Sequence, residues 1–124
     1  MNGFSVEIIE STIKLTAKER IKLKDTTNAI KLDEATQIDK VVISPVDYAI
    51  LAIHNEKATP NDYENYLVIS ADGKKYVTGS KSFWDSFLNI YNEMKDESEP
   101  YEIEIYRVPS KNYKGKDFIS CSIL

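Results

Sequence analysis

The chain has 124 residues, of which 42% are hydrophobic and 29% are charged, and its formal net charge is -4. This length and composition are typical of one globular domain and exclude a disordered or fibrous protein. The single cysteine excludes an intramolecular disulfide and a cysteine-based zinc site, and the single histidine excludes a multi-histidine metal centre. The acidic total argues against a protein that coats duplex DNA through overall charge alone. We expect no metal and no cofactor.

The first 26 residues are predicted to be an N-terminal extension of ambiguous structure. Thr16 and Glu19 have the spacing of a capping box, which predicts a short helix after Thr16. The extension either enlarges the domain or contacts a neighbouring subunit, and both alternatives stay open. No run has the features of a secretion signal or approaches membrane-spanning length, so we expect a cytoplasmic protein without membrane contact.

Residues 41–54 are rich in β-branched and aliphatic side chains and predict one long bent strand, or two strands broken at Pro45. Next along the chain, strand-like runs flank the dipeptide Asp72-Gly73, a strong signal for a tight hairpin turn. A two-residue loop at this dipeptide would place Ile69 opposite Tyr76.

A helix is predicted to begin after Ser80 or Ser82, either of which can cap it. Apolar side chains then recur at helical spacing from Phe83 onward, which is typical of a helix packed on a core. Trp84 belongs to this stripe and is therefore predicted to be a packing residue first.

A last hairpin is predicted from residues 101–108 and 116–124, with Val108 opposite Lys116. This pairing places apolar residues together on one face, as cross-strand packing requires. The predicted neighbours are Ile105 with Ile119, Ile103 with Cys121, Tyr101 with Ile123, Arg107 with Asp117, and Tyr106 with Phe118.

The order of these elements is a long strand, a hairpin, a helix and a second hairpin. It predicts a mainly β fold with one principal helix, an OB-fold-like five-stranded Greek-key barrel over residues 27–124. The helix would lie between the third and fourth strands. OB-folds bind oligonucleotides on the face of strands 2 and 3 and on the loops between strands 1–2 and 4–5.

The predicted strand 4–5 loop lies in residues 107–116, which carry four positive charges and no acidic residue. Cations bind phosphates and aromatic rings stack on bases, so this segment is typical of a site for single-stranded nucleic acid. The candidate binding residues are Arg107, Lys111, Asn112, Tyr113, Lys114 and Lys116 with Tyr106 and Phe118, and secondarily Lys74, Lys75, Tyr48 and Tyr66. Tyr48 and Tyr66 can stack on bases only if their side chains point outward.

Three segments, residues 76–80, 82–84 and 109–118, resemble small single-stranded DNA-binding proteins of phages and mobile elements in Gram-positive bacteria. The resemblance covers roughly the last two-thirds of the chain and includes no catalytic motif. It implies an OB-like fold, single-stranded DNA as the ligand, a role in replication or recombination, and the cytoplasm of a bacterial host cell. Phage or host replication and recombination proteins, and further copies of the chain, are the other implied partners. The acidic, phenylalanine-ended tail of common bacterial single-stranded DNA-binding proteins is absent from the sequence, so recruitment of repair proteins through such a tail is not expected.

An enzyme is the less favoured alternative because the sequence has no nucleophile, nucleotide-binding or metal-binding motif. His54 is interpreted as a strand-end residue and Cys121 as a small buried residue of a strand. A protein-binding or inhibitory module that uses the same barrel stays open as a second function. RNA stays open as an alternative to DNA.

Overall fold

The computed structural model describes residues 3–110 and 116–124. Strand accounts for 44% of the structure, and these ranges also contain three helices, so the fold is a β-rich α+β fold. Its strands form two sheets, neither of which is closed into a barrel within the described ranges. The two compact units are Met1–Ile30 with Val46–Gly79, and Lys31–Pro45 with Ser80–Leu124.

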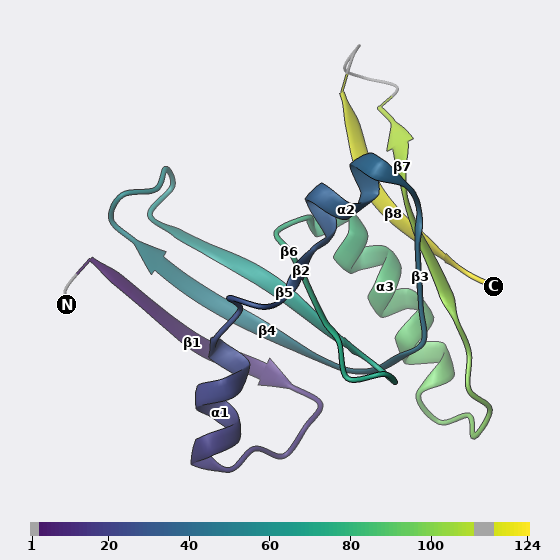
Figure 1. The fold of residues 1–124 in the computed structure, drawn as a ribbon, viewed down its shortest axis with the longest axis horizontal. Helices are drawn as coiled ribbons and strands as arrows, with labels where there is room; N and C mark the ends of the chain where they lie inside the picture. The colour runs from purple at the N-terminus through teal and green to yellow at the C-terminus, as the bar shows by residue number, and fades with distance from the viewer. Residues whose placement is uncertain (1–2, 111–115) are drawn as a thin grey trace. The chain divides into compact units, whose positions relative to one another are not determined.

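The first unit contains a five-stranded sheet in the order β1-β4-β5-β6-β2 (Figure 1). Its elements are β1 (Phe4–Ser11), α1 (Ala17–Lys24), β2 (Ile30–Lys31), β4 (Pro45–Asn55), β5 (Asp62–Ser70) and β6 (Lys75–Thr78). The predicted capping box is confirmed, because Glu19 N donates to Thr16 Oγ1 and Thr16 N donates to Glu19 Oε1, each over 3.2 Å. These two bonds satisfy amide groups that the first turn of α1 leaves unpaired.

Helix α1 and three strands bury one apolar cluster in the first unit. Its buried members are Leu23, Ala49, Leu67 and Val77. Ile8 of β1 packs against this cluster, and β1 is hydrogen-bonded to β4 in antiparallel register. The N-terminal segment therefore enlarges the sheet, which is the first of the two alternatives left open by the sequence.

The β5–β6 hairpin is present, but its predicted register is wrong by one residue. Ser70 N donates to Lys74 O and Gly73 N donates to Ser70 O, which gives a three-residue loop. Gly73 has φ +86°, the left-handed conformation that ends such loops. As a result, Tyr76 lies opposite Val68 rather than opposite Ile69.

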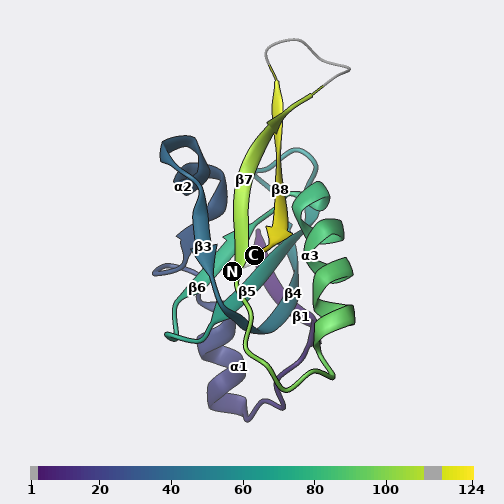
Figure 2. The ribbon, with the colours of Figure 1, turned by 90° about the vertical axis from the view of Figure 1, so that its right-hand side faces the viewer.

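The second unit contains a three-stranded sheet in the order β3-β7-β8, seen in Figure 2 with its helices. Its elements are α2 (Leu32–Ile38), β3 (Val41–Ile43), α3 (Lys81–Met94), β7 (Ile103–Pro109) and β8 (Asp117–Ile123). Of the two alternatives predicted for residues 41–54, the structure has the two separate strands, since β3 and β4 belong to different sheets. Helix α2 is not among the predicted elements.

Helix α3 begins where the sequence predicts, with Ser80 Oγ accepting a bond from Phe83 N. The side chains of Phe83, Trp84 and Phe87 are at most 1% exposed. The rings of Trp84 and Phe87 stack with centroids 5.2 Å apart, so the prediction that Trp84 is a packing residue is confirmed. The Ser82 hydroxyl donates to the Ile119 carbonyl oxygen over 3.0 Å and fixes α3 along β8.

The β7–β8 hairpin is also present, with a register two residues away from the predicted one. Ser110 N donates to Lys116 O, and Val108 lies opposite Phe118. A shift of two residues keeps every side chain on its predicted face because the strand repeat is two residues. The predicted apolar face is accordingly buried, with Ile103, Ile105, Ile119 and Cys121 each at most 6% exposed.

None of the helices in the described ranges has the length and apolar character needed to cross a membrane.

We expect Gly73→Ala to lower the free energy of unfolding by about 1–2 kcal/mol, because a Cβ disfavours left-handed backbone. An added Cβ at Gly73 would meet no atom within 4 Å, so the loss would be conformational rather than steric. Gly79→Ala is the matched control, since its Cβ would make only ordinary contact with Asn65 at 3.5 Å. Urea unfolding measures both, and equal stability of the two variants would contradict this account of the loop.

Candidate nucleic-acid interface

One face of the three-stranded sheet carries exposed apolar and aromatic side chains. Cross-strand pairing assigns to it Val42, Glu104, Tyr106, Val108, Phe118, Ser120 and Ser122. We call this set the aromatic face. Phe118 is 40% exposed and Val42 is 44% exposed, so the face presents an aromatic ring and an aliphatic side chain to solvent.

The structure brings together two of the predicted stacking residues, Tyr106 and Phe118, on the aromatic face. Tyr106 lies opposite Ser120 and is half-buried, and its hydroxyl shares a hydrogen bond with Ser122 Oγ. This bond fixes the Tyr106 ring along the sheet. Phe118 offers the more accessible ring of the two.

Two cations directly precede strands of this sheet in the sequence. Lys40, just before β3, has its Nζ 2.9 Å from Glu104 Oε1, and this hydrogen bond raises the pKa of the lysine. Glu104 therefore balances the charge of Lys40. Lys116 is exposed and immediately precedes β8. Lys40 and Val42 are not among the predicted site residues, because the pairing of β3 with β7 joins segments about sixty residues apart and has no local signal.

Arg107 was predicted to contact phosphates, but its guanidinium is engaged within the second unit. Nη1 lies 2.6 Å from Asp117 Oδ1, which confirms the predicted contact with that residue. Nη2 donates to Asp33 O over 2.6 Å, and Nε donates to Thr36 Oγ1 over 3.1 Å. Since Asp33 and Thr36 belong to α2, Arg107 ties this helix to the hairpin and is a structural residue before it is a ligand contact.

The secondary candidates for nucleic-acid binding belong to the first unit. One of the two tyrosines among them does not point outward, which was the condition for its role in stacking. Tyr66 is 5% exposed, so its ring is not available for stacking. Tyr48 is half-buried. Lys75 Nζ donates to Lys22 O over 3.0 Å, and Lys74 Nζ lies 3.9 Å from Asp72 Oδ2. The other predicted residues, Lys111, Asn112, Tyr113 and Lys114, lie outside the described residues.

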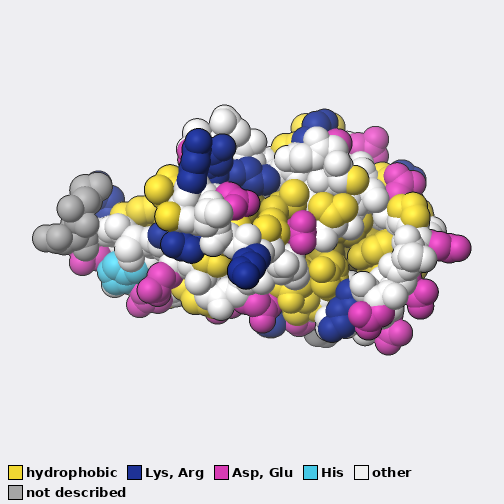
Figure 3. Space-filling view, turned by 90° about the horizontal axis from the view of Figure 1, so that it is seen from below, with side chains coloured by type: hydrophobic (Ala, Val, Ile, Leu, Met, Phe, Trp, Pro, Cys, Tyr) yellow, Lys and Arg dark blue, Asp and Glu magenta, His cyan; other side chains and the backbone are white. Residues whose placement is uncertain are grey.

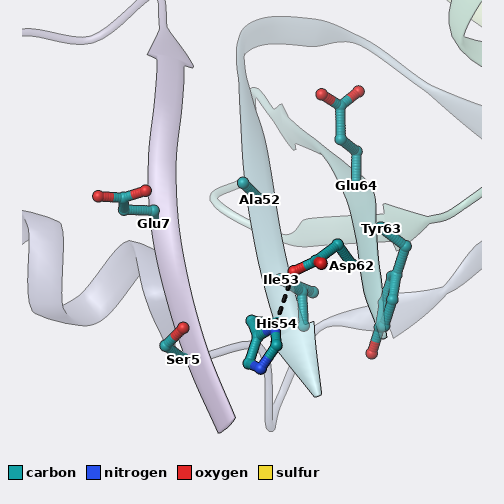
Figure 4. Close-up of a pocket in the computed structure, with 8 residues that line it drawn as sticks. All are labelled: Ser5, Glu7, Ala52, Ile53, His54, Asp62, Tyr63 and Glu64. Carbon is teal, nitrogen blue, oxygen red and sulfur yellow. Dashed lines mark hydrogen bonds and ion pairs between the residues drawn. The ribbon is translucent and has the colours of Figure 1, made fainter. Parts of the chain in front are cut away.

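The first unit has a separate pocket of about 340 Å³, which Figure 4 shows across β1, β4 and β5. His54 Nδ1 lies 2.7 Å from Asp62 Oδ1, and its Nε2 lies 3.8 Å from Glu56 Oε1. In Figure 3 the single histidine, in cyan, accordingly has acidic side chains next to it. Glu7 and Glu64 also line the pocket, so its surface would repel a phosphate backbone.

The thiol of Cys121 and the possible metal ligands of the described residues were the other groups to consider. Burial raises the pKa of the Cys121 thiol to about 12, which disfavours the nucleophilic thiolate. The described ranges hold no group of three or more histidine, cysteine, aspartate or glutamate side chains placed to bind a metal ion.

No family model, no curated protein and no solved structure matches the chain. The resemblance to phage and mobile-element single-stranded DNA-binding proteins therefore stays a prediction from the sequence.

We expect Arg107→Lys to lower the free energy of unfolding by about 0.5–1.5 kcal/mol, because one ammonium group cannot make all three bonds, of which the one to Thr36 Oγ1 is partly buried. Arg20→Lys is the matched control, since Arg20 makes one exposed hydrogen bond to Leu15 O. Urea unfolding of both variants tests this role. An Arg107→Lys protein as stable as the Arg20→Lys protein would show that the contacts of Arg107 with Asp33, Thr36 and Asp117 do not stabilise the fold.

The hydrogen bond that His54 Nδ1 makes to the Asp62 carboxylate raises the pKa of His54 above 6.5, with a smaller contribution from Glu56. A raised pKa stabilises the fold below the unfolded-state value of about 6.5, and this stabilisation is lost as pH rises through the folded-state value. We expect Asp62→Asn to lower the pKa of His54 more than Glu56→Gln does, as measured by NMR titration of the imidazole. The same titration curve in wild type and Asp62→Asn would contradict the pairing.

Proposed function

We propose that the chain binds single-stranded DNA without catalysis and that the strand lies across the aromatic face and along the basic segment between β7 and β8. The observation that carries this proposal is the exposed Phe118 ring, which lies on a sheet face at the base of the most basic loop of the chain. Bases stack on exposed rings irrespective of sequence, whereas cations contact the phosphates. RNA fits the same chemistry and is the alternative ligand.

The charges around Phe118 support an anionic ligand at this end of the hairpin. Lys116 lies two residues before Phe118 in the sequence, and Arg107 already has Asp117 as its counter-ion. The sequence adds Lys111 and Lys114 in the segment outside the described residues. We expect Lys111, Lys114 and Lys116 to contact phosphates, and we expect a smaller contribution from Arg107, whose guanidinium is bonded to Asp33, Thr36 and Asp117.

The connectivity of the strands supports an OB-like fold, which is part of the proposal. On the two sides of Pro45, β3 pairs with β7 and β4 pairs with β5, as the bent first strand of an OB-fold pairs with its fourth and second strands. Helix α3 lies in the chain between β6 and β7, the place of the OB-fold helix. In this correspondence the basic segment is the strand 4–5 loop, one of the two loops that bind oligonucleotides.

The resemblance to phage and mobile-element proteins supports a role in replication or recombination in the bacterial cytoplasm. In that role the chain would sequester and protect single strands. Phage or host replication and recombination proteins would be its neighbours on the DNA.

A protein-binding or inhibitory module is the second candidate function, and the aliphatic part of the aromatic face favours it. Val108 lies directly opposite Phe118 on this face, and Val42 lies further along it, opposite the acidic Glu104. Exposed apolar surface rimmed by charge is typical of protein interfaces.

Fluorescence anisotropy of labelled oligo-dT at a low and a moderate salt concentration tests the proposal. We expect wild-type affinity to fall with salt, because phosphate contacts release counter-ions. Phe118→Ala should weaken binding about 5- to 150-fold with an unchanged salt slope, since stacking contributes about 1–3 kcal/mol per base. The triple replacement of Lys111, Lys114 and Lys116 by glutamine should instead reduce the salt slope, by about 2 for three single-strand contacts.

Ile123→Ala is the matched control for Phe118→Ala, because Ile123 is also exposed on β8 but belongs to the opposite face of the sheet. Thermal melting verifies that each variant folds. No binding by the wild type at low salt, or binding that does not respond to salt, would exclude the DNA-binding proposal. Unchanged affinity in both folded variants would favour the protein-binding module.

A further inference from the structure

Strand β1 lies at the edge of the five-stranded sheet in Figure 1 and pairs on one side with β4. Within the described residues no strand pairs with its other side. The carbonyl of Gly3 accepts a hydrogen bond from Glu56 N, so residue 3 faces β4. Because backbone groups of successive residues alternate in direction, Phe4, Val6 and Ile8 direct their N–H and C=O groups outward.

We propose that this edge pairs with β1 of a second copy of the chain, in antiparallel register about a twofold axis at Val6. Such an interface is isologous, with the same residues contributed by both copies. The cross-strand pairs are Phe4 with the second copy's Ile8, Val6 with the second copy's Val6, and Ser5 with the second copy's Glu7.

This register fits the sequence of β1 on both faces. One face brings together Phe4, Val6 and Ile8 of both copies, and aromatic or β-branched residues opposite one another are favourable cross-strand pairs. Phe4 is 49% exposed in the single chain, and the second copy's Ile8 would cover part of it. On the other face, Glu7 meets a serine rather than another carboxylate.

The neighbouring registers are worse. A shift by two residues in one direction places Glu7 opposite Glu7, and like charges directly opposite destabilise a pair. The shift in the other direction shortens the paired segment to the end of β1. The Val6-centred register is therefore the longest one without a like-charge pair.

A bulge limits the length of this interface. The register of β1 against β4 shifts between Ile8 and Glu10, which interrupts the regular edge. Pairing is thus confined to residues 4–8 of each copy. An edge this short buries less area than a permanent dimer needs, so the association is a weak and reversible one. The association would join two five-stranded sheets into one and would bring two aromatic faces into one dimer. This proposal is independent of the ligand that the aromatic faces bind.

Sedimentation velocity from micromolar to millimolar concentration tests the proposal on the full chain. We expect the wild type to pass from monomer to dimer with concentration. Val6→Pro removes the outward N–H at the twofold axis without removing a bond to β4, and should weaken the dimer at least about tenfold. Val6→Ala keeps that N–H, is the matched control, and should dimerise to within a few-fold of wild type.

Charge substitutions at exposed Ser5 test the register itself. Ser5→Glu places a second acid opposite Glu7 and should weaken the dimer, whereas Ser5→Lys should strengthen it about two- to thirtyfold over two symmetric pairs. The two Ser5 variants test the proposed dimer even if Val6→Pro does not fold. A wild type that stays monomeric up to millimolar concentration, or a dimer that Ser5→Glu and Ser5→Lys affect alike, would overturn the proposal.

Discussion

Pro45 imposes the constraint on which the rest of the architecture depends. It has no backbone N–H, so a hydrogen-bonded ladder cannot run unbroken through residues 41–55. The structure divides this run into β3 and β4, and each half becomes a member of a different sheet. The sheets are completed by separate hairpins, β5–β6 for β4 and β7–β8 for β3. The two hairpins therefore join strands on opposite sides of this break.

Signals contained within a few residues predicted the structure well. The capping box at Thr16, the cap at Ser80 and the break at Pro45 each depend on neighbouring atoms. The registers of the two hairpins could not be predicted in the same way. A register depends on the loop length, and the loop length depends on backbone conformation, such as the left-handed conformation of Gly73. The alternation of apolar residues contains no information on loop length. Alternation still predicted the buried face of β7 and β8, since a two-residue slip leaves it unchanged. Helix α2 has seven residues, too few for a periodic pattern to be distinctive.

The candidate site was less predictable, because the use of a side chain depends on partners far away in the sequence. The charge of Arg107 indicated a phosphate contact, but its acceptors Asp33 and Thr36 lie more than seventy residues earlier in the chain. Tyr66 was selected as an aromatic strand residue, and burial removes it from any surface. Phe118 lies on the strand face that the apolar alternation alone predicted, and its ring is exposed there. Contacts within the fold thus determine how far a charged or aromatic side chain is accessible at the surface.

The buried Cys121 has a practical consequence for following the motions of the second unit. It is the single thiol of the chain, and burial both covers it and raises its pKa to about 12. A thiol reagent would therefore modify it chiefly when β8 separates from its neighbours and exposes the sulfur. The native sequence thus carries a built-in reporter of strand opening, without any introduced label.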